Sequence, residues 1–399
     1  MITYEQYLAK SAVQKGVIDV FLSKDDASYA QFDPELGYTV GNALIPDGMD
    51  GSLSITTSQA NGARSSMMYR KLPSRINTYG DSFTQCSQTN DGETWQEYLA
   101  AHLGEPIRNF GVGGFGVYQA YRRLLRTEQT EDGAEYLILY VWGDDHFRSV
   151  MRCRHAVIYP FWDHEGGFRF HNNFWCNIEM DLDSGCLVER ENVLSSSESL
   201  YKMTDPAFMV ESLRDDLMIQ LCVIDNVALA SIDITRLNAL AEILGVASID
   251  ESDRSTVSAS GKALKHAYGF AVTKHILDQA TTFCQKSDKK LLVCLLCPTT
   301  TRQLLDNRPR YDQSIVDYLQ EKRMLYFDMN VVHQRDYASF RLPIEDYLKR
   351  YFIGHYNPTG NHFFAYSIKN TIVDWLTPEP QTYRKGTQKA FDYSGYLPE

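Results

Sequence analysis

A serine and a histidine are the residues of this chain whose types and settings best fit covalent chemistry. Ser82 follows Gly80 and Asp81 at the end of residues 75–79, a segment whose pattern predicts a β-strand. A serine hydroxyl becomes a good nucleophile only when a base within hydrogen-bonding reach takes its proton, and neutral histidine is the suitable base near pH 7. His355, in the loop before the last predicted helix, is the candidate base. The pair predicts nucleophilic attack on a carbonyl carbon.

Attack on a carbonyl places negative charge on its oxygen, which needs hydrogen-bond donors. The backbone N–H groups of Ser82 and Gly114 are the candidates, because a glycine lets the backbone approach a ligand closely. Gly114 ends the run Asn109-Phe-Gly-Val-Gly-Gly, and a third polar block, Gly143-Asp144-Asp145, follows the apolar residues 135–142. Each block alone also suits an ordinary turn. Their joint occurrence in this order favours a serine-based site.

The elements that must position these blocks alternate between helix and strand from Ser82 onward. Such alternation predicts a parallel sheet with crossover helices, and ligand sites of open α/β sheets lie at the carboxyl ends of the strands. The predicted strands after 75–79 are 106–110, 135–142, 290–296 and 325–328, and the predicted helices are 94–103, 118–125, 259–286, 312–322 and 361–376. The polar blocks therefore converge at one edge of the sheet.

The order and spacing of the blocks resemble the SGNH (GDSL-type) hydrolase family over residues 75–145 and 285–376. The resemblance implies a flavodoxin-like, three-layer α/β/α sandwich with a parallel sheet, here carrying a large insertion. It also implies that Ser82 is the nucleophile and His355 the base, and that Ser82, Gly114 and the position of Asp144 form the oxyanion site. Asp81, Asp145 and Asn357 stand in the same blocks and are candidates for supporting roles.

The third block departs from the family pattern. Asp144 stands where the family usually has an asparagine that donates to the oxyanion. A carboxylate about 3 Å from an oxyanion repels it by roughly 5 kcal/mol at an effective dielectric constant near 20. Asp144 must therefore be protonated, paired with a cation such as Arg148, or turned away.

The histidine block departs as well. The family usually has an aspartate three residues before the histidine to orient it, and this chain has Phe352 there. A backbone carbonyl could hold the imidazole of His355 instead, or Asp346, Asp328 or Asp144 could supply the carboxylate.

Four regions are expected along the chain. Residues 1–72 form an N-terminal helix and β-extension, 73–149 and 256–376 the α/β core, 150–255 an insertion, and 377–399 a C-terminal strap. An insertion at the end of a strand lies over the site, so it is the expected lid and selectivity element. Its aromatic residues could stack on a sugar or acyl chain, or form its own core: Tyr159, Phe161, Trp162, Phe168, Phe170, Phe174 and Trp175.

Composition limits the function classes. A net charge of −12 without a basic stripe disfavours nucleic acid and an anionic membrane surface as partners. No run of about 18 apolar residues and no leader-like start are present, so we expect a cytoplasmic protein. Cys294 and Cys297 have the spacing of a redox pair but lie in a predicted buried strand, which favours core cysteines. His146 and His362 lack metal-ligand spacing, and no cofactor or metal is expected.

The sequence thus predicts a serine esterase acting on an acyl ester of a small molecule or carbohydrate. Ser82 would form an acyl-enzyme that passes its acyl group to water or to another acceptor. The alternative is a catalytically impaired binding or scaffold protein that kept the fold, which the departures at Asp144 and Phe352 favour.

Overall fold

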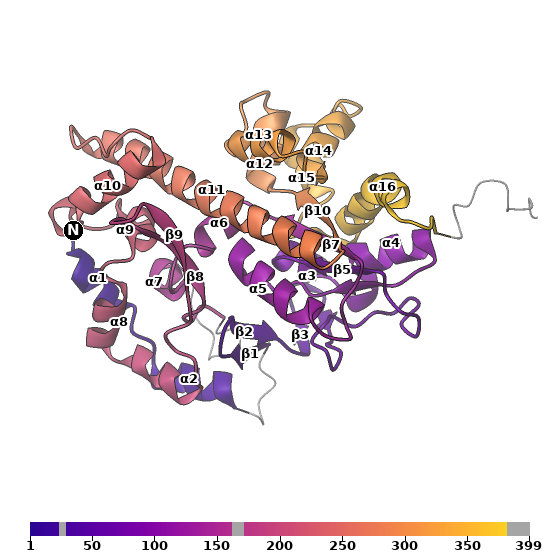
Figure 1. Cartoon of the computed structure of the whole chain (residues 1–399), viewed down its shortest axis with the longest axis horizontal. Helices are drawn as coiled ribbons and strands as arrows, with labels where there is room; N and C mark the ends of the chain where they lie inside the picture. Colours follow the sequence, from indigo (N-terminus) through magenta and orange to yellow (C-terminus); the bar gives the residue numbers. More distant parts are fainter. Residues whose placement is uncertain (24–28, 162–170, 381–399) are drawn as a thin grey trace, which may run out of the picture.

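A five-stranded parallel sheet forms the centre of the molecule (Figure 1). The computed structural model describes residues 1–23, 29–161 and 171–380. The sheet order is β11-β10-β7-β5-β6, from strands β5 (Ile76–Tyr79), β6 (Ile107–Asn109), β7 (Tyr136–Val141), β10 (Lys290–Leu295) and β11 (Tyr326–Asp328). Numbered along the chain, this is the order 2-1-3-4-5 of flavodoxin-like sheets. The predicted fold class is confirmed.

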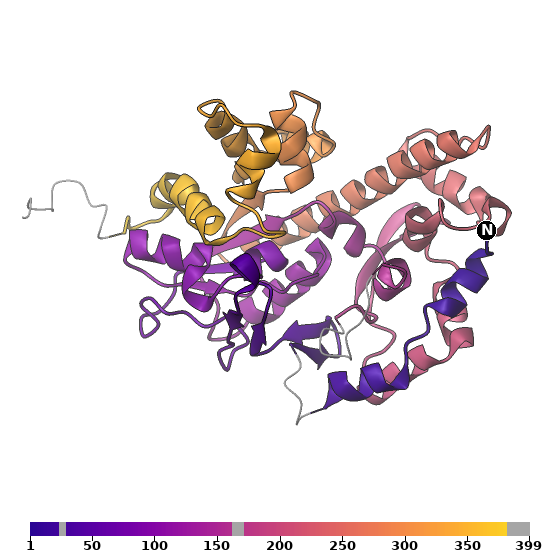
Figure 2. The ribbon, with the colours of Figure 1, turned by 180° about the vertical axis from the view of Figure 1, so that it is seen from behind.

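Both faces of the sheet are covered by helices, which explains the continuous apolar sequence of its central strand. Leu137, Leu139 and Val141 of β7 belong to the core beneath α5 (Val117–Glu128) and α11 (Arg254–Lys286). The alternate residues, such as Ile138 and Tyr140, belong to a second core beneath α4 (Trp95–Leu103) and α16 (Pro358–Trp375). Figure 2 shows α4 and α16 side by side, away from the long α11.

Several short helices lie between β10 and the final helix, and not all of them were predicted. The segment contains α12 (Pro298–Leu305), α13 (Gln313–Glu321), α14 (Met329–Tyr337) and α15 (Ile344–Lys349), of which the sequence indicated only α13. The final helix starts at Pro358, three residues before the predicted start. Asn357 caps it by accepting the Gly360 N–H at 2.9 Å, and proline is well tolerated in the first turn.

The segment 150–255 forms a lobe beside the sheet, and its buried residues share one continuous core with one face of the sheet. It contains a hairpin of β8 (Asn177–Asp181) and β9 (Cys186–Arg190), and the helices α7 (His155–Ile158), α8 (Pro206–Leu213), α9 (Leu217–Val223) and α10 (Ile234–Leu244). At 1.5 Å per residue, the 33 residues of α11 span about 50 Å, and Figure 1 shows this helix running from the lobe to the sheet. The N-terminal helices α1 (Tyr4–Lys10) and α2 (Lys15–Leu22) pack on the same lobe.

The aromatic residues predicted for this segment divide between core and surface. Phe174 and Trp175 are fully buried, as expected for a core, and Phe161 is 75% exposed. Tyr159 donates from its hydroxyl to the carbonyl of Tyr7 at 3.0 Å. The other three aromatic residues, Trp162, Phe168 and Phe170, and the strap beyond residue 380 lie outside the described residues.

The N-terminal extension is tied to the loop that follows Ser82. It forms two antiparallel hairpins from β1 (Ala30–Asp33), β2 (Gly37–Val40), β3 (Ala43–Ile45) and β4 (Ser54–Thr56). The buried Arg64 then donates to the carbonyls of Gln85, Cys86 and Thr89 at 2.5–2.8 Å and pairs with Asp91 at 2.8 Å. One guanidinium thereby fixes the whole loop.

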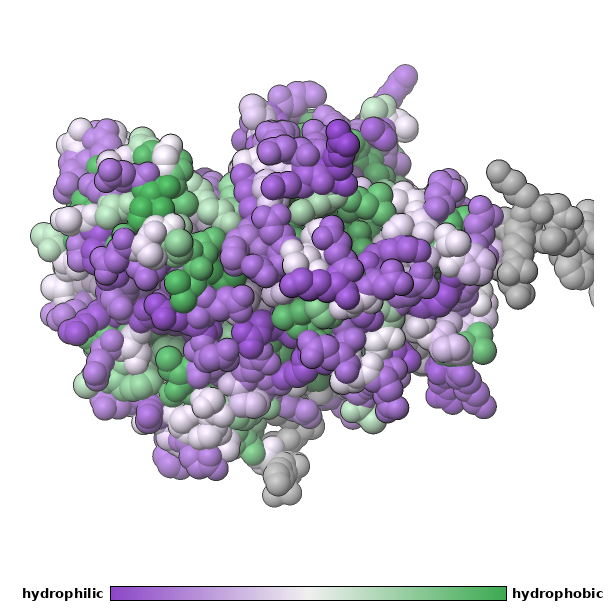
Figure 3. Space-filling view, viewed as in Figure 1, coloured by the Kyte–Doolittle hydropathy of each residue, from purple (hydrophilic) through white to green (hydrophobic). Residues whose placement is uncertain are grey.

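The outer surface is mainly hydrophilic on the face in Figure 3, with hydrophobic residues in separate small areas. Within the described residues, no helix has both the length and the apolar character needed to cross a membrane. The described cysteines carry free thiols, and those of the predicted core strand, Cys294 and Cys297, are buried.

Candidate active site

Ser82 is the first residue of the short helix α3 (Ser82–Gln85), directly after strand β5 and Gly80. Asp81 caps this helix by accepting the Phe83 N–H at 2.9 Å. A Cβ on Gly80 would lie 2.2 Å from Thr84 Oγ1 and 3.0 Å from the Tyr140 backbone oxygen, so only glycine fits there. The strand, glycine, acid and serine of the sequence therefore form a tight turn with Ser82 at the sheet edge.

His355 is oriented by the side-chain amide of Gln88. Oε1 of Gln88 lies 2.9 Å from Nδ1 of His355 and also accepts the His355 backbone N–H at 2.9 Å. Nε2 of Gln88 donates to the Asp47 carbonyl at 2.9 Å, which fixes which end of the amide is the oxygen. Because that oxygen can only accept, Nδ1 of His355 carries the proton and Nε2 is left as the base.

The surroundings of His355 keep its ring neutral. Burial and the nearby Arg148 guanidinium lower the pKa of His355 to about 4. Gly354 has φ +122°, and a Cβ there would lie 2.8 Å from Gln88 Oε1. The glycine before the histidine is thus required for the Gln88 contact.

None of the carboxylates considered for orienting His355 has that role. Phe352 stacks on Tyr356 with ring centroids 4.6 Å apart. Asp346 pairs with Lys349 at 3.7 Å, and Asp328 pairs with Arg310 while capping α14. The acceptor is Gln88, which lies 267 residues earlier in the chain.

Ser82 and His355 line one cavity of about 350 Å³ together with Gly113 and Gly114. The Ser82 and Gly114 N–H groups donate to no acceptor among the described residues, whereas the Gly113 N–H donates to Gln85 Oε1 at 2.6 Å. Gly114, the predicted oxyanion residue, therefore has the free amide. Ser82 Oγ lies 3.4 Å from Asp81 Oδ2, and within the described chain it has no hydrogen bond to His355.

The third block differs from the prediction by one residue. The Asp144 side chain is 57% exposed, lies 3.6 Å from Arg148 and does not line the cavity, so this carboxylate is turned away as one predicted alternative required. Asp145, at the start of α6 (Asp145–Arg148), is 1% exposed. It accepts the Trp142 N–H at 3.0 Å and Arg148 Nη1 at 3.1 Å. Asp145, rather than Asp144, is the inward carboxylate.

Asp81, Asp145 and Arg148 form a buried charged cluster behind Ser82. Burial raises the pKa of Asp81 to about 6 and, together with the Asp81 charge, raises the pKa of Asp145 well above its usual range. The Arg148 guanidinium opposes both shifts.

Residues outside the α/β core complete the cavity wall, and the sequence did not indicate that the N-terminal extension would contribute to it. Tyr29 and Asp47 come from the N-terminal extension, and Arg154 and His171 come from the segment 150–255. The Tyr29 hydroxyl donates to Gln85 Oε1 at 2.8 Å, so the extension also supports the Gly113 contact. The expected cover of the site is therefore shared between two distant parts of the chain.

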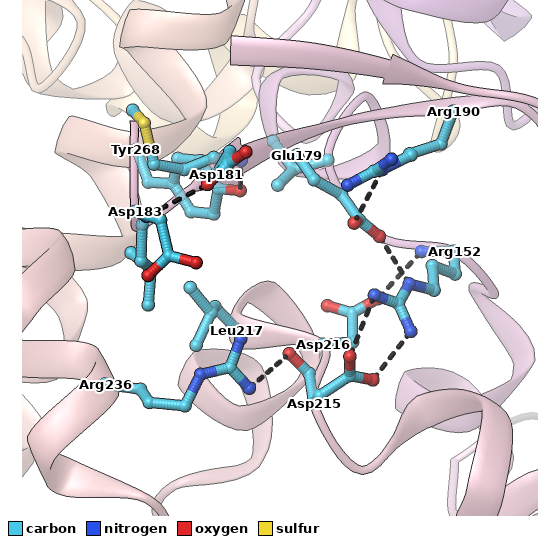
Figure 4. A pocket seen from close by; sticks show the side chains of 13 residues that line it. Arg152, Glu179, Asp181, Asp183, Arg190, Asp215, Asp216, Leu217, Arg236 and Tyr268 are labelled. Atoms are coloured by element: carbon cyan, nitrogen blue, oxygen red, sulfur yellow. Dashed lines mark hydrogen bonds and ion pairs between the residues drawn. The ribbon is translucent and has the colours of Figure 1, made fainter. Parts of the chain in front are cut away.

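A second cavity, of about 510 Å³, lies in the lobe and is shown in Figure 4. Arg152 bridges Glu179 and Asp215 there, and Arg190 also pairs with Glu179, at 3.3 Å. Its described lining has no serine or histidine. Although it is larger, its described lining offers no serine–histidine pair, so the smaller cavity is the candidate active site.

No protein-family model and no curated protein matches this chain. Among the solved structures that match is a protein from Desulfitobacterium hafniense DCB-2, assigned to the G-D-S-L family of lipolytic proteins. The match covers 74% of this chain and 97% of that one, with 10% sequence identity and a TM-score of 0.32.

Proposed function

We propose that this chain is a serine hydrolase of the SGNH type that cleaves acyl esters of small molecules or carbohydrates. The observation that carries the proposal is the cavity shared by Ser82 and His355, with Nδ1 of His355 held by Gln88. That contact leaves Nε2 as the basic nitrogen, in the same cavity as a serine at the start of a helix. A cavity of about 350 Å³ suits a small ligand.

In the proposed reaction, Ser82 Oγ attacks the carbonyl carbon of the ester while His355 Nε2 takes the hydroxyl proton. The bond from the carbonyl carbon to the alcohol oxygen then breaks, and His355 returns its proton to the departing alkoxide. Water attacks the acyl-enzyme by the same route, which releases the acid and restores Ser82.

The oxyanion would accept hydrogen bonds from the backbone N–H groups of Ser82 and Gly114. Both groups lie at the cavity and have no other described acceptor, which is the condition for a preorganised oxyanion hole. The missing hydrogen bond between Ser82 and His355 is compatible with catalysis, because such contacts are often long in ligand-free enzymes and shorten in the substrate complex.

A fluorophosphonate probe tests the proposal directly, because it phosphonylates an activated serine. We expect labelling of the wild-type protein, loss of labelling in Ser82→Ala and full labelling in Ser87→Ala. Ser87 lines the same cavity and is therefore a matched control. An unlabelled but folded wild-type protein would refute the hydrolase proposal.

One observation favours the second candidate, a binding protein that has lost the chemistry. Ser82 Oγ contacts Asp81 rather than His355, and an acid that holds the hydroxyl competes with the base. Asp81→Asn separates the two candidates. A hydrolase keeps or gains labelling at Ser82, whereas a protein without an active nucleophile stays unlabelled.

A further inference from the structure

Two arginines lie in the wall of the candidate active site. Arg148 comes from α6, Arg154 comes from the turn before α7, and both line the cavity that contains Ser82. Burial and the Arg148 charge lower the pKa of Arg154 to about 10, as expected for two guanidinium groups close together in a desolvated place. The chain as a whole has a net charge of −12, so this concentration of positive charge is a local feature of the cavity.

Among the described residues that line the cavity, the two arginines outnumber the acids. Of the described residues that line the cavity, Asp47 carries the one carboxylate, and it accepts a hydrogen bond from Ser54. Arg148 is paired with Asp145 at 3.1 Å and with Asp144 at 3.6 Å, yet its buried Nε has no acceptor among the described residues. A buried guanidinium N–H without an acceptor costs free energy, so a ligand with several acceptor oxygens would be bound favourably at this wall.

The arginines stand close to the reacting centre. The position of a Cβ on Gly114 lies 3.0 Å from Arg154 Nη1, and that of a Cβ on Gly113 lies 3.6 Å from the Ser82 Cβ. The donor of the proposed oxyanion site, the nucleophile and Arg154 are thus grouped around two consecutive glycines. A ligand that spans Ser82 and Arg154 needs only a short chain between its two functional groups.

We infer that the cavity selects an ester whose acyl part carries an anionic oxygen group, bound by Arg148 and Arg154 while the carbonyl lies at Ser82. Guanidinium groups bind carboxylates and phosphates through charge-assisted, often bidentate hydrogen bonds. The inference rests on the proposed hydrolase function. It adds to that function the class of substrate, a short dicarboxylic half-ester or a phosphorylated analogue.

Two aryl esters test the inference through the ratio of their kcat/KM values. Mono(4-nitrophenyl) succinate carries a carboxylate on a short acyl chain, and 4-nitrophenyl acetate lacks one. We expect the wild-type protein to prefer the succinate by at least tenfold, and Arg154→Gln to lose that preference mainly through KM. Arg154→Lys should retain part of it. Arg190→Gln, an exposed arginine at the other cavity, is the matched control and should leave the ratio unchanged.

Two results would overturn the inference. One is an unchanged ratio in Arg154→Gln, and the other is an equal loss of kcat on both esters, which would make Arg154 an oxyanion donor instead. Fluorophosphonate labelling of Arg154→Gln confirms that the variant is folded.

Binding to the Ser82→Ala variant separates this inference from the proposed function. Calorimetry with succinate or inorganic phosphate should show binding that Arg154→Gln removes, whether or not the wild-type protein hydrolyses esters. Tighter binding of succinate identifies a carboxylate ligand, and tighter binding of phosphate a phosphorylated one. No binding of either anion at millimolar concentration would refute the anion site even if Ser82 is an active nucleophile.

Discussion

Gln88 offers the sharpest test of how His355 works. Gln88→Leu keeps approximate volume and removes the oxygen that accepts from Nδ1 and from the backbone of His355. During attack the imidazole becomes a cation, and a hydrogen bond to a charged group contributes about 1.5–3 kcal/mol. Since about 1.4 kcal/mol corresponds to a tenfold change in rate, kcat should fall by roughly 10- to 150-fold.

The companion variant Gln88→Glu places a carboxylate at the same contact. Its negative charge should raise the pKa of His355 from about 4 by stabilising the imidazolium form. It also loses the donated hydrogen bond to the Asp47 carbonyl, so thermal stability should fall.

The assay is the pH profile of kcat/KM on 4-nitrophenyl acetate, with fluorophosphonate labelling as the check on folding. The acidic limb should move to higher pH in Gln88→Glu. A change of less than twofold in kcat for Gln88→Leu, with an unmoved limb in Gln88→Glu, would refute the view that Gln88 orients the base.

Three further predictions concern the pH dependence of activity, the neighbouring acids Asp144 and Asp145, and Arg64, which binds the loop after Ser82. The pKa of His355 is lowered to about 4, and the neutral imidazole is the base. We therefore expect kcat/KM to stay level as pH falls from 7 to about 5 and to drop as pH passes through 4. An acidic limb of the pH profile with its midpoint near pH 6.5 would contradict this. Asp144→Asn should change the melting temperature little, because the Asp144 carboxylate is exposed to solvent, whereas Asp145→Asn leaves the buried Arg148 without its buried partner and should cost about 3–5 kcal/mol in denaturant unfolding; similar losses for both would contradict the assignment. Arg64→Met should lower the free energy of unfolding by a comparable amount and also slow fluorophosphonate labelling, because the loop that carries Gln88 loses the guanidinium that donates to its carbonyls. Unchanged labelling would show that the loop keeps its conformation without Arg64.

The sequence alone determined the sheet and the place of the candidate site. Local patterns were sufficient there: the continuous apolar run of 135–142 requires burial on both faces, and the glycines after β5, β6 and β7 mark tight turns with little room for a side chain. The fold class was therefore predictable, and so was the position of Ser82 at a strand end. The short helices α12, α14 and α15 were missed because each offers too few residues for a clear period.

Only the tertiary structure decided what surrounds the serine. Whether Asp144 or Asp145 faces inward depends on the direction of one turn, and neighbouring acids give no periodic signal to distinguish them. The contact of Gln88 with His355 joins residues 267 positions apart, and Arg154 reaches Gly114 from a different lobe. A single polar residue in a loop carries no local pattern that reveals its partner, because hydrogen bonds and ion pairs across the chain are fixed by packing. The motifs thus located the site, and folding supplied its base-orienting amide and its arginines.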